Sequence, residues 1–531
     1  MKFDSRRSNV RARNGMVATS QPLAAVAGLR MLMSGGTAVD AAVAAAAALN
    51  VVEPFSTGVG GDAFALVWSA RAGQVYALNA SGRSAAAADA EALSSTGYTG
   101  IPDDSPFAVT VPGAVSGWQA LLERFGNLEM ADVLRPAIDY AESGYPVSEM
   151  VAYQWEGAQS RLKQHSSGEE LLLGGRAPRA GEIMSMPSLA DSLRTIAYGG
   201  ADAFYKGHIA ERIAAFVQER GGWLTTDDIS EHEATWEEPI TTNYRGVDVW
   251  QCPPNNQGVN VLLGLNIAEG FDIGAMGAQS ADRHHYLIES ARLALTDGMY
   301  HITDPAQMRM DTGRLISKSY AAGRRRFIRE EHAMDNVPRG VKPSDGDTVY
   351  ITCVDGEGNA CSLINSVYSD FGTGLVVPGT GIALHSRGAS FSLDPSHPNV
   401  LAPKKRPFHT LIPGMATKDG DLWLSYGVMG TVQQAQGQIQ VLSNMIDFGM
   451  TPQDALDAAR FSYRPLEGEV GLEPRIPEKV ADELRGRGHR IVITESHPLY
   501  FGGGQVIARD AESGALTGGS EPRNDGCAVG W

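Results

Sequence analysis

Apolar positions in the first part of the chain recur at helical spacing. Residues 23–33 show this pattern and are followed by a glycine pair, which is typical of the end of a helix. Thr37 and Asp40 have the spacing of a capping box for a second helix over 39–52, which is apolar on nearly every face and is therefore expected to be buried. Residues 64–68 then have the character of a strand. The sequence predicts helix, helix, strand.

A glycine-rich segment, residues 58–63, contains the pattern G-x-G-x-x-A. In a dinucleotide-binding loop this pattern follows a strand and opens a helix. Here Pro54 precedes the segment and the expected strand follows it. We therefore interpret the segment as a tight turn, whose glycines allow the backbone to approach another backbone or a ligand closely.

The pattern changes from helical spacing to alternation near residue 348. Helical spacing occurs at 117–124, 134–143, 209–219, 258–267 and 280–300. After residue 348, 349–354 and 360–367 alternate around a turn at 355–359, and further strands are expected at 382–384, 422–426 and 505–509. The last dozen residues before Thr348 are polar and turn-rich. We expect a mainly helical block, an exposed loop, and a strand-rich block that begins at Thr348.

Composition and charge exclude several classes of protein. The 531 residues are 43% hydrophobic and 20% charged, as in ordinary globular proteins. Lys and Arg number 44 against 61 Asp and Glu, so the net charge is 44 − 61 = −17, which argues against nucleic acid or an anionic membrane as the main partner. The apolar run 41–52 is too short to span a bilayer. Arg6-Arg7 resembles a twin-arginine signal, but no apolar segment follows it, so we predict a cytoplasmic protein.

Common signatures of metal, cofactor and nucleophile sites are missing. The four cysteines form no C-x-x-C pair and are expected to be free buried thiols. The sequence has no G-x-S-x-G elbow, no H-E-x-x-H and no P-loop. His284 and His285 are adjacent on a predicted helix and so point to different faces. We expect neither a metal nor a cofactor.

The remaining candidate for chemistry is the Asp347-Thr348 pair at the start of the strand-rich block. A threonine hydroxyl is a weak nucleophile and needs a base. Cleavage of the Asp347–Thr348 bond frees the α-amino group of Thr348, and such an amine has a pKa of roughly 7.7–8.0. One residue then supplies both nucleophile and base. Its hydroxyl can also make the cut by attacking the preceding carbonyl. An ordinary threonine at the start of a strand is the alternative interpretation.

The surrounding motifs resemble those of the gamma-glutamyltransferase family of N-terminal nucleophile hydrolases. The similarity extends over about residues 14–526 and includes 347–360, Ser366 and 371–374, together with 15–19, 35–42, 58–62, 111–113, 222–225, 405–407 and 501–504. This resemblance implies an α+β fold, a four-layer αββα sandwich of two subunits cut from one precursor, 1–347 and 348–531. It also implies Thr348 as nucleophile, Ser366 as its hydroxyl partner, and Gly430-Thr431 as the oxyanion hole, where the family has two glycines.

Several positions depart from the family's glutamyl-binding pattern. By this resemblance, Ser390 stands at the position of an amino-binding Asp, Arg387 at a Gln and Tyr368 at an Asn, while His409-Thr410 replaces a carboxylate-binding double serine. Arg83 matches the family's carboxylate-binding arginine. Relative to the family pattern, the site gains an arginine at 387 and loses an acid at 390. This change favours a substrate group that is anionic over one that is cationic. Segments 386–395 and 79–83 resemble a subgroup that includes oxamate amidohydrolase-like proteins.

We therefore predict a self-processing threonine amidohydrolase or acyltransferase that acts on a small amide through an acyl-enzyme at Thr348. The acyl group is expected to carry a carboxylate but no α-amine. Two alternatives stay open: a gamma-glutamyltransferase or glutathione hydrolase, and an inactive relative that acts as a binding protein. The two subunits are each other's expected partners. A homodimer of such heterodimers is left open, and neither nucleic acid nor membrane is expected as a partner.

Overall fold

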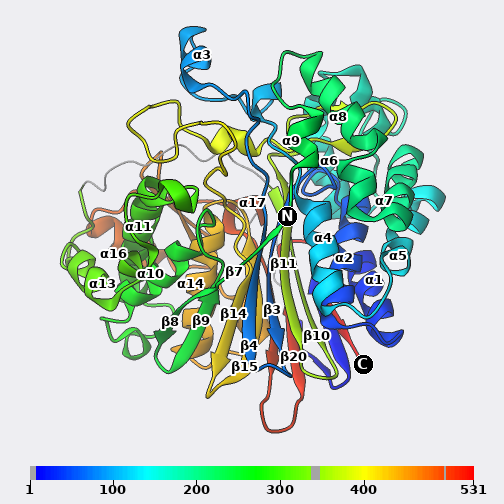
Figure 1. The fold of residues 1–531 in the computed structure, drawn as a ribbon. Coiled ribbons are helices and arrows are strands. Elements are labelled where there is room, and N and C mark those ends of the chain that lie inside the picture. The colour runs from blue at the N-terminus through cyan, green and yellow to red at the C-terminus, as the bar shows by residue number, and fades with distance from the viewer. Residues whose placement is uncertain (1–6, 336–346, 496–497) are drawn as a thin grey trace.

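The computed structural model describes residues 7–335, 347–495 and 498–531. Most of the loop expected before Thr348 lies outside these ranges. Two antiparallel seven-stranded sheets lie at the centre of the molecule (Figure 1). Sheet I has the order β1 (Val10–Ala12), β20 (Leu516–Ser520), β19 (Gly503–Arg509), β15 (Asp421–Met429), β14 (Gly414–Lys418), β9 (Val247–Gln251) and β8 (Ile240–Tyr244). Sheet II has the order β21 (Cys527–Gly530), β2 (Gly15–Thr19), β10 (Asp347–Asp355), β11 (Ala360–Tyr368), β3 (Asp62–Ser69), β4 (Gln74–Ala80) and β7 (Thr235–Glu237).

Helices cover the outer face of each sheet. Sheet II is covered by α1 (Pro22–Met33), α2 (Ala38–Val52), α4 (Ala114–Phe125), α5 (Met130–Ser143) and α7 (Pro187–Tyr205). Sheet I is covered by α10 (Gly258–Ala268) and α14 (Gln433–Ile446), with α11 (Ala281–His301), α13 (Lys318–Arg325) and α16 (Glu478–Gly486) around them. Side chains such as Phe64, Tyr350, Ile364 and Met415 fill the space between the sheets. The four-layer αββα sandwich predicted from the sequence is confirmed.

Smaller elements surround this sandwich. The remaining helices are α3 (Ala90–Ser95), α6 (Glu149–Leu162), α8 (His208–Gln218), α9 (Thr226–Ser230), α12 (Thr312–Leu315), α15 (Pro452–Asp457) and α17 (Pro498–Phe501). The short strands are β5 (Tyr145–Pro146) with β6 (Ile183–Met184), β12 (Val376–Val377) with β13 (Ile382–Ala383), and β16 (Phe461–Arg464), β17 (Glu469–Leu472) and β18 (Ile491–Ile493).

The predicted first helices and the glycine turn are confirmed. Helix α2 begins with the capping box of Thr37 and Asp40, and every residue of the helix is buried. Within the turn, a Cβ on Gly60 would lie 2.2 Å from the carbonyl oxygen of Ala383, and one on Gly61 would lie 2.3 Å from that of Ser366. Close approach of backbone to backbone therefore requires glycine at both positions.

The expected division into a helical block and a strand-rich block is wrong in one respect. Residues before Thr348 supply β1, β8 and β9 to sheet I and β2, β3, β4 and β7 to sheet II. Several of these strands are short and carry polar residues, such as Thr241, Thr242 and Asn243 in β8, so they lack a recognisable alternation. Both sheets therefore mix strands from the two sides of Thr348.

The segment before the undescribed loop is held against α11 and α16. The Met334 N–H donates to Glu289 Oε2 at 2.8 Å, and Arg292 donates to the Met334 carbonyl at 2.9 Å. Behind this contact, the ring nitrogens His285 Nδ1 and His489 Nε2 are 2.8 Å apart. The pKa of His489 is lowered to about 3. Burial is the largest cause, and the positive charges of His285, Arg292 and Arg487 add to it.

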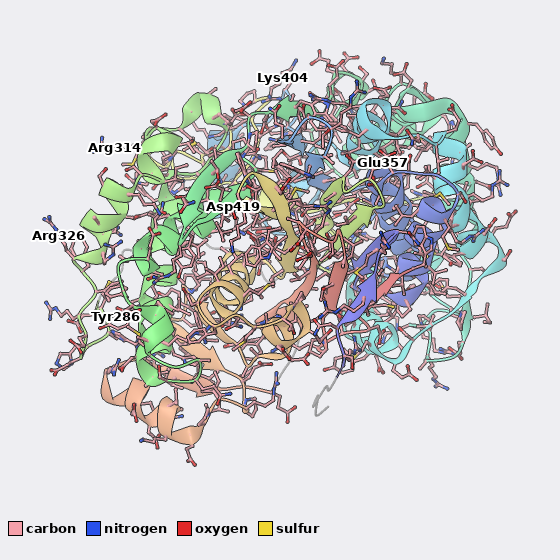
Figure 2. All side chains as sticks on the ribbon, turned by 90° about the horizontal axis from the view of Figure 1, so that it is seen from below. Tyr286, Arg314, Arg326, Glu357, Lys404 and Asp419 are labelled. Carbon is pink, nitrogen blue, oxygen red and sulfur yellow. The ribbon has the colours of Figure 1, made fainter. Side chains whose placement is uncertain are left out.

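The basic run at residues 324–329 is a mixture of structural and exposed side chains. Arg324 pairs with Asp297 at 2.8 Å, and Arg325 donates to backbone carbonyls at the end of α10. Arg326 is exposed and points outward, as does Arg314 (Figure 2). All four cysteines are free, and Cys353 and Cys361 face each other across β10 and β11 without a disulfide. Among the described residues, no helix is long and apolar enough to cross a membrane.

His489 should make the folded protein sensitive to acid. Its pKa is about 3 in the folded state and about 6.5 in an unfolded chain, so below pH 6.5 only the unfolded state binds the proton. This histidine should lower the free energy of unfolding by about 2 kcal/mol between pH 7 and pH 5. Urea unfolding at the two pH values should show a smaller loss for His489→Gln than for the wild type. An equal loss in both proteins would contradict this assignment.

Candidate active site

Thr348 lies buried at the start of β10, in the middle of sheet II. Its Oγ1 donates to Ser366 Oγ at 3.2 Å, and Ser366 Oγ also accepts the backbone N–H of Tyr368 at 2.8 Å. The register between β10 and β11 shifts between Asp347 and Val349, because two residues of β11, Ser366 and Val367, lie opposite Thr348 and form a bulge in β11. Bulges of this kind redirect side chains at functional sites. The structure thus brings together the two hydroxyl residues that the sequence singled out.

The backbone at Gly430-Thr431 adopts the left-handed region. Gly430 has φ 115° and Thr431 has φ 40°. The position where the resembled family has a second glycine therefore needs the glycine-favoured conformation, and Thr431 adopts it with a side chain. Among the described residues, the N–H groups of Gly430 and Thr431 donate to no other residue. Two adjacent uncommitted N–H groups have the character of an oxyanion hole.

Two sets of contacts hold this loop. The Gln257 amide donates to the carbonyl of Thr410 at 2.8 Å and to that of Thr431 at 3.0 Å, which links two of the predicted site segments. On the other side, the α-carbon of Gly502 lies 3.3 Å from where a Cβ on Gly430 would stand. Gly502 is in turn held by Arg460, which donates to its carbonyl at 2.7 Å.

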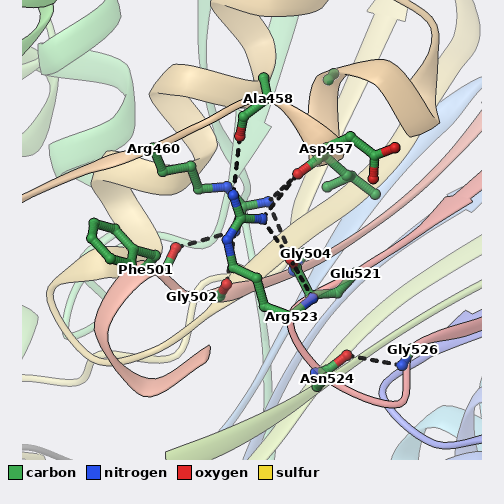
Figure 3. A network of polar contacts seen from close by, with 12 residues as sticks. Asp457, Ala458, Arg460, Phe501, Gly502, Gly504, Glu521, Arg523, Asn524 and Gly526 are labelled. Atoms are coloured by element: carbon green, nitrogen blue, oxygen red, sulfur yellow. Dashed lines mark hydrogen bonds and ion pairs between the residues drawn. The ribbon is translucent and has the colours of Figure 1, made fainter. Parts of the chain in front are cut away.

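Arg460 belongs to a buried network of two arginines and two glutamates, of which Figure 3 shows Arg460, Arg523 and Glu521. Glu521 accepts from Arg460 at 2.9 Å and from Arg523 at 2.6 Å, and its Oε2 also accepts the Gly504 N–H at 2.6 Å. Glu473 forms a two-point pair with Arg523 at 2.6 and 2.7 Å. Two positive charges face two negative charges in the network, and its side chains bond the backbone of Phe501, Gly502 and Gly504, so it fixes this segment against Gly430.

Arg387 is completely buried and lies against Tyr368, whose N–H bonds Ser366. Its Nη1 donates to Thr410 Oγ1 at 2.8 Å, and its guanidinium lies over the Tyr368 ring at 4.1 Å. Burial lowers the pKa of Arg387 to about 10, while Asp62 opposes that shift, so the group is charged at neutral pH. Nε and Nη2 have no hydrogen-bond partner among the described residues. A buried cation with open donors is suited to bind an anion.

His409 contacts a carboxylate that the sequence analysis missed. Its Nε2 lies 3.0 Å from Asp62 Oδ2, and burial together with the charge of Arg387 lowers the pKa of His409 to about 3. His385, also missed, places Nδ1 3.2 Å from the same oxygen. Asp62 was assigned only to the glycine turn, and His385 lies in a segment without a recognisable motif. Gln257 was missed too, although the polar run just before the apolar helix α10 was visible.

Ser390 and Arg83 have other contacts in the structure. The Ser390 hydroxyl lies 2.9 Å from each of the carbonyl oxygens of Arg387 and Phe408. Arg83 is exposed and binds Asp304 and the Lys404 carbonyl, each at 3.0 Å. None of these contacts is with Thr348. Within the described ranges, no group of three or more His, Cys, Asp or Glu side chains is arranged to hold a metal ion.

Comparison with known proteins agrees with this geometry. A family model described as gamma-glutamyltranspeptidase matches residues 24–531. The chain belongs to the gamma-glutamyltranspeptidase family. It is accordingly an enzyme of the hydrolase and acyltransferase class with an N-terminal nucleophile hydrolase fold, which confirms the family, fold and enzyme class predicted from the sequence.

Three relatives illustrate the range of this family. The chain is 39% identical to the glutathione hydrolase-like YwrD proenzyme of Bacillus subtilis, over 97% of this chain and 98% of that protein. It is 35% identical to the oxamate amidohydrolase proenzyme of Klebsiella pneumoniae, over 99% of each. The crystal structure of cephalosporin acylase from Bacillus halodurans is similar with a TM-score of 0.94 and 45% identity, over 100% of this chain and 98% of that one.

Replacing Glu521 should disturb both stability and the Gly430 loop. Glu521→Gln leaves two buried arginines with one carboxylate, which should cost about 3–5 kcal/mol in the free energy of unfolding. Urea denaturation measures this loss. As a control, Glu469→Gln removes the partner of the exposed Arg490 and should cost less than about 1 kcal/mol. Equal effects of the two substitutions would contradict the role of the network.

Proposed function

We propose that this chain is a precursor that cuts itself between Asp347 and Thr348 and then hydrolyses a small amide, or transfers its acyl group, through Thr348. The observation that carries the proposal is the buried Thr348–Ser366 hydroxyl pair at the start of β10. Tyr368, whose N–H bonds Ser366, carries Arg387 and its open donors over its ring. The names of the relatives support it, since they describe proenzymes, an amidohydrolase and an acylase.

In the proposed maturation, Thr348 Oγ1 attacks the carbonyl carbon of Asp347, and the bond to the Thr348 nitrogen breaks. Water hydrolyses the resulting ester, which leaves a carboxylate on Asp347 and a free amine on Thr348. In the intact chain this nitrogen is an amide and cannot serve as a base. Cleavage therefore creates both the base and the mature active site.

In the proposed catalytic cycle, the α-amine of Thr348 takes the proton from its own hydroxyl as the oxygen attacks the substrate amide. Ser366 hydrogen-bonds the attacking oxygen, and the N–H groups of Gly430 and Thr431 stabilise the tetrahedral oxyanion. The amine then returns the proton to the leaving nitrogen, so the C–N bond breaks and an ester to Thr348 remains. Water, or an acceptor amine, attacks this ester and frees the enzyme.

We further propose that the acyl group carries a carboxylate that binds Arg387. The guanidinium is buried, charged and open at Nε and Nη2, while Thr410 and the Tyr368 ring fix its orientation. The position of an amino-binding Asp in the resembled pattern is Ser390, whose hydroxyl is engaged with two carbonyls. This arrangement favours an acyl group without an α-ammonium. We propose a peripheral or indirect role for Arg83, because it is paired with Asp304.

Two alternatives correspond to other outcomes of the same experiments. The first is a gamma-glutamyltransferase or glutathione hydrolase, and the Bacillus subtilis relative is named glutathione hydrolase-like. Such an enzyme would hydrolyse γ-glutamyl-p-nitroanilide at least as well as glutaryl-p-nitroanilide, which lacks the α-amine. An inactive relative would neither process nor hydrolyse. The left-handed backbone at Thr431 supports activity, since the loop keeps the conformation that a glycine would adopt.

Self-cleavage should be visible on a denaturing gel. The wild type, 56.5 kDa in all, should give bands of about 56.5 × 347/531 ≈ 37 kDa and about 56.5 × 184/531 ≈ 20 kDa. Thr348→Ala should leave one full-length band, because no hydroxyl remains to attack. Thr348→Ser keeps a hydroxyl and is the matched control that should still process. A single full-length band from active wild-type protein would refute the mechanism.

Removing the guanidinium should weaken binding of a carboxylate-bearing acyl group. Arg387→Met should raise the KM of the processed enzyme for glutaryl-p-nitroanilide by about tenfold or more, as expected for a lost charge-assisted hydrogen bond. Hydrolysis of butyryl-p-nitroanilide, which has no carboxylate, should change much less. An unchanged KM for the glutaryl substrate would remove Arg387 from the binding site.

A further inference from the structure

Asp62 stands on the same face of sheet II as the proposed nucleophile. It begins β3 directly opposite Ser366 of β11. Directly opposed residues of an antiparallel pair have their Cβ atoms about 5 Å apart and point to one side. Two residues further along these strands, Phe64 and Ile364 face the core between the sheets. Thr348 bonds Ser366 from the other neighbouring strand, so the three side chains form a row at one end of the sheet.

The carboxylate of Asp62 is surrounded by donors and positive charge. Its Oδ1 accepts the Gly82 N–H at 3.0 Å. Its Oδ2 lies 3.0 Å from His409 Nε2 and 4.0 Å from Arg387 Nε. Burial alone would raise the pKa of Asp62, but the charge of His385 and hydrogen bonds from both histidines hold it well below its usual range. Asp62 is therefore ionised at neutral pH.

His385 contacts the same carboxylate oxygen as His409. Its Nε2 lies 2.8 Å from the Thr110 carbonyl, which can only accept, so this nitrogen donates to it. Its Nδ1 lies 3.2 Å from Asp62 Oδ2. Asp62, His385, His409 and Arg387 are all completely buried, so the contacts of Asp62 leave its carboxylate little room to move.

The environment of Arg387 leaves one edge for that carboxylate. Asp62 lies on the Nε side, Thr410 binds Nη1, and the Tyr368 ring covers one face. Nη2 is left without a hydrogen bond among the described residues. Among the side chains that the structure describes, Asp62 is the one acid within ion-pair distance of this guanidinium. Because its oxygens already meet Gly82, His409 and His385, it is poorly placed to receive a substrate ammonium.

We propose that Asp62 is a positioning residue that sets acyl specificity: held by His409 and His385, it fixes Arg387 so that one edge is presented to a substrate carboxylate. It touches neither the substrate nor the reacting atoms. This inference rests on the proposed function, since it concerns the acyl pocket of Thr348. It gives Asp62 a role distinct from that of an ammonium-binding acid.

The test compares glutaryl-p-nitroanilide with butyryl-p-nitroanilide on processed enzyme, through the ratio of their kcat/KM values. Asp62→Asn places an N–H toward Arg387 and leaves this buried cation without its counter-ion, so Arg387 is no longer held in place. The ratio should fall about tenfold or more, mainly through a higher KM for the glutaryl substrate. In an Arg387→Met background, the same substitution should change the ratio less than about twofold, because Asp62 acts through Arg387.

Asp355→Asn is the matched control, since Asp355 is a buried aspartate at the other end of β10 that binds the 357–359 turn and the start of α2. It should leave the ratio unchanged. A ratio preserved in Asp62→Asn, or lost equally in both backgrounds, overturns the role of Asp62 alone. A selective loss of γ-glutamyl-p-nitroanilide hydrolysis would instead make Asp62 an ammonium site. A wild type that does not prefer the glutaryl substrate overturns the carboxylate pocket as well.

If Asp62→Asn gives no soluble processed protein, His409→Asn replaces it, because it removes the hydrogen bond that holds Asp62 Oδ2. The glutaryl-to-butyryl ratio should again fall, with the larger part of the change in KM. A preserved ratio in this variant also overturns the inference.

Discussion

The position of Thr348 depends on the pairing of β10 with β11. β11, which follows the proposed cut, pairs with β10 from Asp347 onward, whereas β2, which precedes the cut, pairs with β10 only from Ile351 onward. At Thr348 the bulge in β11 brings Ser366 opposite the first residues of β10, and the Thr348 hydroxyl donates to Ser366. The Thr348 hydroxyl is therefore held by the fold itself, before any substrate contact contributes.

The rest of the site is built from loops that enclose this strand end. One loop brings Arg387 over the Tyr368 ring, another places His409 and Thr410, and a third carries Gly430 and Thr431. Each loop is supported by buried polar groups, including the amide of Gln257 and the network of Arg460 and Glu521. Buried polar groups with matched partners favour one geometry over its neighbours, which is what a pre-organised site requires.

The sequence was informative where local patterns decide the structure. The capping box of Thr37 and Asp40, the hairpin on either side of the 355–359 turn, and the strand that begins at Thr348 all have short-range signatures. The short, polar strand β8 was not predicted, because its pairing comes from tertiary contacts. The role of Asp62 was not predicted for the same reason. Asp62 lies near Arg387 because β3 meets a loop more than 300 residues away in the chain, and no local pattern records such a contact.

The interleaving of strands has a consequence for the mature molecule. If the chain is cut before Thr348, the two pieces still share both sheets, with β10 paired to β2 and β9 paired to β14. Neither piece can leave without breaking the core between the sheets. Unfolding would then release two molecules in place of one, so recovery of the mature enzyme would depend on protein concentration, whereas the uncut precursor folds as a single chain. The mature enzyme would thus refold less readily than the precursor, and it would persist because its two pieces separate slowly.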